Sequence, residues 1–112
     1  MMNCFEKIRN IFEALSIRSY ANVYTGNDLK TWATYNLSDR QPVAFSDNDN
    51  PMYVDYVQVH LFLPINVNYF DIMKRISEDL KKAGFTAPDL MVELETDNKL
   101  QHLVFSCQIV EE

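Results

Sequence analysis

The two histidines, His60 and His102, are the residues of this sequence best suited to catalysis or metal binding. Imidazole titrates near neutral pH and is a common metal ligand. Both lie in segments where apolar and polar residues alternate, which predicts strands, and both fall on the less apolar face. They can therefore meet across a sheet and join Asp55 or Glu93 in a metal site. Their spacing matches no metal-site motif, so ordinary strand positions or interface contacts are the preferred interpretation.

The acidic, asparagine-rich stretch 46–51 offers a second group of oxygen ligands, including Asp47 and Asp49. Hard cations such as Ca²⁺ bind clustered oxygen atoms, but the ligand order, the central glycine and the final glutamate of an EF-hand are missing. Because Asp and Asn also form turns, we expect a solvated loop here.

The remaining chemistry-bearing residues favour packing over catalysis. Cys107 shares a strand face with Phe105 and Ile109, where burial raises a thiol pKa, and Cys4 lies on an apolar helix. We expect both thiols to be reduced packing residues. The sequence contains no nucleophile elbow and no glycine-rich phosphate loop. It therefore predicts no enzymatic activity, no catalytic residues, no cofactor and no bound metal.

Two amphipathic helices are predicted to position these residues. Apolar residues recur with helical spacing over about residues 4–16, after Asn3, which can cap the helix. A second helix, over about residues 69–83, follows Asn68 as its cap. Gly84 and Phe85 have the arrangement of a Schellman stop at its end.

Strands are predicted over residues 31–35, 43–45, 52–63, 90–95 and 100–110. A polar turn is predicted at residues 38–41. The segment 17–30 is ambiguous, although Tyr20 and Val23 fit a short strand there. The order α-β-β-β-α-β-β predicts a two-layer α+β domain, with both helices packed on one face of a mostly antiparallel sheet. The expected core consists of apolar residues from both layers: Phe5, Phe12, Val57, Val59, Leu61, Ile72, Ile76, Leu80, Phe85, Leu103 and Phe105.

The two long strands each have one apolar face and one half-polar face. A half-polar face on a central strand indicates contact with another chain or with solvent, so we predict self-association. The expected contact residues are those of the half-polar faces and the acidic loop: Asp47, Asp49, Gln58, His60, His102, Ser106 and Gln108.

Length and charge limit the remaining possibilities. The 112 residues, 47% of them hydrophobic, predict one domain over 1–112. Sixteen acids against ten bases give a net charge of −6, which argues against binding to nucleic-acid phosphates or anionic membranes. There is no apolar run of 18 residues and no signal-peptide pattern, so we expect a cytoplasmic protein that does not span a membrane.

An ordered series of short segments resembles the small tail-terminator or tail-completion (head-tail joining) proteins of long-tailed bacteriophages and prophages. The series covers about the last 80 residues and consists of 32–35, 39–45, the acidic loop, 56–60, Asn68-Tyr69, 82–85 and 102–105. The resemblance implies a small α+β domain without enzymatic activity. It also implies a ring, typically hexameric, at the head-proximal end of the tail tube.

In that role the ring stops growth of the tube and joins the head connector, so the expected partners are other copies, the tail-tube protein and the connector protein. The expected location is the host cytoplasm during assembly and then the virion tail. An acidic protein suits a channel through which DNA slides without binding. The alternatives are a different head-tail adaptor, a regulatory domain outside any phage, or a small enzyme or metal-binding domain that uses His60 and His102.

Overall fold

The computed structural model describes residues 2–26, 30–43 and 52–111 and contains two helices and five strands within them. In chain order these are α1 (Cys4–Ala14), β1 (Ser19–Ala21), β2 (Trp32–Pro42), β3 (Tyr53–Pro64), α2 (Phe70–Lys82), β4 (Asp89–Glu95) and β5 (Leu100–Glu111). The predicted order α-β-β-β-α-β-β is confirmed, although the first two strands, β1 and β2, differ in bounds from the predicted 31–35 and 43–45.

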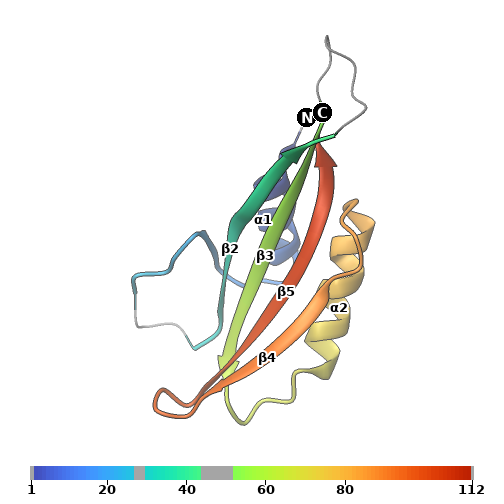
Figure 1. The fold of residues 1–112 in the computed structure, drawn as a ribbon. Helices are drawn as coiled ribbons and strands as arrows, with labels where there is room; N and C mark the ends of the chain where they lie inside the picture. Colours follow the sequence, from blue (N-terminus) through green and yellow to red (C-terminus); the bar gives the residue numbers. More distant parts are fainter. Residues whose placement is uncertain (1, 27–29, 44–51, 112) are drawn as a thin grey trace.

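The strands form one sheet in the order β1-β2-β3-β5-β4. Figure 1 shows β2, β3, β5 and β4 side by side in this order. The short strand β1 runs parallel to β2, and all other neighbours are antiparallel. Both helices lie behind this sheet in Figure 1, so one face is covered and the other carries no helix. We call these the covered face and the open face. The predicted two-layer α+β arrangement is confirmed.

Local sequence signals account for the helix ends. The Asn3 side chain accepts a hydrogen bond of 2.9 Å from the backbone N–H of Glu6 at the start of α1. At the end of α2, Gly84 has a φ of +105°, and the N–H of Phe85 donates to the carbonyl of Leu80. This is the predicted Schellman stop. The predicted cap of α2 is wrong by one residue, because Tyr69 is the cap residue by backbone geometry. The Asn68 side chain still accepts a hydrogen bond from the N–H of Phe70.

The predicted turn at residues 38–41 is wrong, because β2 continues through it to Pro42. The pairing with β3 shifts between Leu37 and Asp39, which places a bulge at Ser38. The carboxylate of Asp39 accepts hydrogen bonds from the Arg40 N–H and the Gln41 side chain, so the polar run is satisfied on an exposed strand.

The predicted strand over residues 43–45 is only partly described, and the ambiguous segment 17–30 contains one short strand. Val43 follows β2 and bonds through its N–H to the carbonyl of Met52, whereas positions 44 and 45 of the predicted strand lie outside the described residues. In the ambiguous segment, Tyr20 lies in β1 and Val23 lies outside it.

The core lies between the helices and the covered face. Alternate residues of β3 and β5 are buried there, as their periodicity predicts, together with Ile8 and Phe12 of α1 and Ile76 and Leu80 of α2. Phe5 and Ile72 were expected in this core but are only partly buried at its margin. Neither helix is long and apolar enough to cross a membrane.

Candidate functional site

The open face holds the described part of the predicted contact surface. Gln58, Ser106 and Gln108 line a hollow of about 270 Å³, and His60 and His102 line another of about 290 Å³. All five side chains are half-buried. The predicted residues Asp47 and Asp49 lie outside the described residues. The open face therefore carries two separate hollows: a polar one beside Gln58 and Ser106, and one beside the histidines that aromatic rings also line.

The two histidines meet across β3 and β5, as their positions predict. His60 Nδ1 lies 2.7 Å from His102 Nε2, and His60 Nε2 lies 3.0 Å from the Asn36 side-chain oxygen. On the far side of the His102 ring, Nδ1 lies 3.8 Å from a Glu93 carboxylate oxygen. Asp55, the other predicted partner, lies on the covered face, because it alternates with the open-face residues of β3. That part of the prediction is wrong.

Hydrogen-bond chemistry fixes the proton positions along the line of side chains Asn36, His60, His102 and Glu93, which we call the histidine row. Since the Asn36 oxygen only accepts, His60 carries its proton on Nε2 and accepts through Nδ1. His102 must then donate from Nε2, which leaves its Nδ1 lone pair facing Glu93. A first added proton therefore binds His102 Nδ1, next to the carboxylate. A second proton on His60 Nδ1 would break the bond between the rings.

Burial is the main influence on both histidines and lowers the pKa of each. Protonated His102 lowers the pKa of His60 further, while Glu93 opposes the shift. At His102 the carboxylates of Glu93 and Glu95 oppose the effect of burial. The pair is therefore neutral at neutral pH. Because Glu93 and His60 approach opposite nitrogens of the His102 ring, the three side chains do not converge on one ion.

A row of stacked rings crosses the open face beside this pair. Trp32 stacks on Phe62 with ring centroids 4.7 Å apart, and Phe62 stacks on His102 at 4.2 Å. Tyr24 contacts Trp32 at 5.3 Å and Tyr20 at 4.8 Å, which continues the row toward β1. Sequence reasoning missed this row, because it depends on the register of three strands. Alternation identified only the face on which His102 lies.

The outer edge of the sheet at β4 is apolar on its covered-face side. Leu90, Val92 and Leu94 are 37%, 36% and 63% exposed, although they alternate in the pattern of a core strand. We call these three residues the β4 strip. An exposed apolar row on an edge strand is typical of a protein contact surface.

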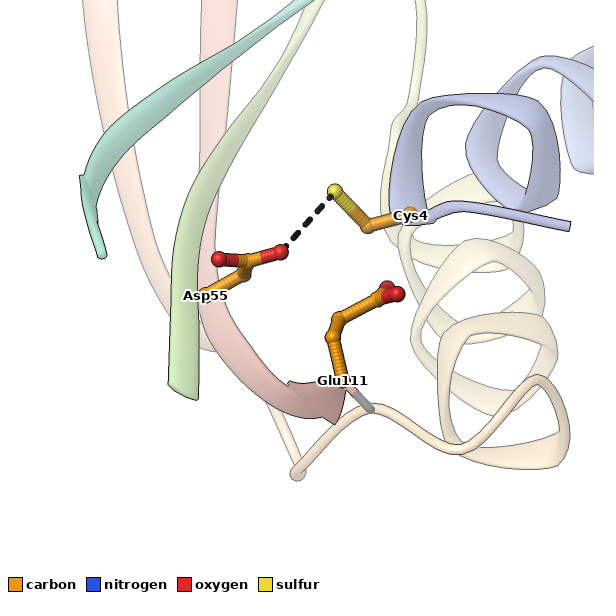
Figure 2. Close-up of side chains that lie close together, drawn as sticks. All are labelled: Cys4, Asp55 and Glu111. Atoms are coloured by element: carbon orange, nitrogen blue, oxygen red, sulfur yellow. Dashed lines mark hydrogen bonds between the residues drawn. The ribbon is translucent and has the colours of Figure 1, made fainter. Parts of the chain in front are cut away.

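A third group of polar side chains lies within the covered face (Figure 2). Cys4 of α1, Asp55 of β3 and Glu111 of β5 bring their ligand atoms within 4.8 Å of one another. Sequence reasoning missed this cluster, since the three residues are far apart in the chain and form no motif. The prediction that the cysteines are buried is confirmed, and burial raises the pKa of Cys4 to about 11 and that of Cys107 to about 12.

No protein-family model matches the sequence, and no curated protein matches it. Among solved structures, the fold is similar to a chain in "Virion of native gene transfer agent (GTA) particle". The similarity has a TM-score of 0.55 at 10% sequence identity and covers 93% of this chain and 87% of that chain. At this identity the comparison establishes a shared fold across nearly the whole of both chains.

Proposed function

We propose that this chain is a non-enzymatic structural protein of a phage or prophage tail. In this role copies form a ring, typically six, at the head-proximal end of the tail tube, where the ring ends tube growth and joins the head connector. The observation that carries the proposal is the fold shared, over 93% of the chain, with a chain from a GTA virion. The ordered segments that resemble tail-terminator proteins support the same role. The protein acts in the host cytoplasm during assembly and remains in the virion tail.

The two edges of the sheet differ in a way that suits a ring. Ring neighbours contact one another through two different surfaces. On one edge, the pairing of β2 with β1 ends at Tyr35. Beyond Tyr35, β2 contains a bulge, and its Arg40 N–H is already bonded to Asp39. The last residue of β2, Pro42, has no N–H. These features discourage strand addition. On the other edge the β4 strip is exposed, so we assign the contact with a neighbouring copy to β4.

The open face is then the surface for the tube or connector protein. Its half-buried histidines and aromatic rings are held in fixed positions by hydrogen bonds and stacking, as recognition surfaces require. The net charge of −6 disfavours retention of DNA phosphates by a ring through which DNA passes.

The proposal is tested by adding the purified chain to growing tubes of the tail-tube protein encoded by the same phage or prophage. Electron microscopy should show shorter tubes as the chain concentration rises, with a ring at one end. Leu94→Asp should abolish the ring, because it places a charge in the β4 strip. Lys74→Asp introduces the same side chain at an exposed position of α2, serves as the control, and should leave the ring intact.

Unchanged tube lengths, with no chain bound at tube ends, would contradict the terminator role. A chain that binds the isolated connector but never the tube would instead support a head-tail adaptor. Equal ring formation by both aspartate variants would disprove the assignment of the neighbour contact to β4.

A further inference from the structure

The Cys4, Asp55 and Glu111 cluster has the geometry of an ion site. Figure 2 shows the three side chains converging from three elements: the first residue of α1, the covered face of β3 and the end of β5. One sulfur and two carboxylates supply ligand atoms that all lie within 4.8 Å of one another. The cluster is separate from the histidine row, because it lies on the opposite face of the sheet.

Its carboxylates have unused bonding capacity. The Asp55 side chain is only 7% exposed, and its Oδ2 accepts a single long hydrogen bond, 3.9 Å, from the Cys4 thiol. Arg40 Nε lies 2.9 Å from Oδ1 as an ion pair, but its N–H is not aligned with that oxygen, which accepts no hydrogen bond. Glu111 Oε1 is also buried and accepts none.

The charges point in the same direction. Two carboxylates face one guanidinium, and the Arg40 side chain is itself half-exposed, at 49%. Within the described part of the chain, one of the two carboxylates therefore has no ion-pair partner. Asp55 is buried and Glu111 is half-buried, and buried charges are normally paired or coordinate metals. Among the described residues, Arg40 forms the only ion pair to this cluster.

We infer that Cys4, Asp55 and Glu111 bind a divalent transition-metal ion of the zinc type. The ligand atoms are Cys4 Sγ, Asp55 Oδ2 and Glu111 Oε1, with one position left for water. Arg40 pairs with Asp55 Oδ1 and so turns Oδ2 toward the ion, in the manner of an outer-shell partner. The sulfur ligand disfavours Mg²⁺ and Ca²⁺, which prefer oxygen alone.

Binding is coupled to loss of a proton. A thiol binds a metal ion as the thiolate, so the Cys4 proton must leave when the site is filled. The ion displaces this proton to solvent when the Sγ–metal bond forms, and affinity therefore rises with pH. The bound ion links α1 to both central strands, which gives the site a structural role.

The test is a titration of the reduced full-length chain with Co²⁺, which reports thiolate ligands through a charge-transfer band in the near ultraviolet. We expect one equivalent to bind and Zn²⁺ to displace it. Cys4→Ser should remove the band. Glu111→Gln should weaken binding by at least about 10–100-fold, the loss typical of removing even an outer-shell partner.

Two controls make the result specific to this cluster. Cys107→Ser removes the other buried thiol, and the double variant His60→Gln/His102→Gln removes both imidazoles. Both should bind Co²⁺ like the parent chain. Circular dichroism checks that each variant is folded, and if Cys4→Ser is not, Glu111→Gln decides. Absence of the band in the folded parent chain overturns the inference, as does a band lost only in a control variant.

Discussion

Strand β3 carries two polar clusters on opposite faces of the sheet, and they differ in how completely they are paired. On the open face, His60 bonds through both ring nitrogens, to His102 and Asn36. On the covered face, Glu111 Oε1 is buried and accepts no hydrogen bond, and Asp55 Oδ1 accepts none although it is ion-paired to Arg40. A half-exposed network can complete its bonds with water, whereas a buried one cannot. The open cluster therefore suits recognition, and the covered cluster suits an internal cation.

Phenylalanine occurs on both faces of the sheet, and its substitution should give the largest difference in unfolding free energy between them. Phe105 of β5 is fully buried on the covered face, and Phe62 of β3 is half-buried on the open face. Phe105→Ala should lower the free energy of unfolding by about 3–5 kcal/mol, because it leaves a cavity. Phe62→Ala should cost about 1–2 kcal/mol, mainly lost stacking on Trp32 and His102.

Urea denaturation measures both values, and an unchanged slope verifies that the two variants unfold like the parent chain. Equal losses from the two substitutions would contradict the division into a buried covered face and a half-exposed open face. Under the proposed function, Phe62→Ala should in addition weaken attachment to the tube or connector while the variant remains folded.

The same division explains what sequence reasoning predicted and what it missed. Alternation along β3 and β5 located both faces, and the Gly84 signal located the end of α2, because these features depend on neighbours in the chain. The bulge at Ser38 was mistaken for a turn, since polar residues fit both. The Cys4 cluster required the packing of α1 on the sheet, which no local pattern encodes.

Acid should destabilise the protein through the open-face histidines. Burial lowers the pKa of His60 and His102 below the ordinary value of about 6.5 that they regain on unfolding. As the pH falls through that value, the unfolded chain binds more protons than the folded chain, so the free energy of unfolding decreases. The histidines stop lowering the free energy of unfolding once the pH is below their pKa values in the folded protein.

Denaturation curves recorded between roughly pH 5 and pH 8 measure this effect, since histidine titrates in that range. In the double variant His60→Gln/His102→Gln, the free energy of unfolding should change less steeply with pH, because the contribution of the histidines is removed. Carboxylates contribute to both proteins, so the difference between the two curves isolates the pair. Identical slopes, or a parent chain that becomes more stable in acid, would contradict the lowered pKa values.

The smallest expected effect on stability tests the direction of the histidine row. Glu93 is 56% exposed at 3.8 Å from His102 Nδ1, so solvent screens the pair and Glu93→Gln should change the free energy of unfolding by less than about 0.5 kcal/mol. The carboxylate nevertheless raises the pKa of His102 against the effect of burial. Its removal should lower that pKa further, as NMR titration of the ring measures, whereas Glu78→Gln on α2 should not. A His102 pKa that stays constant or rises would mean that the first proton binds elsewhere in the row.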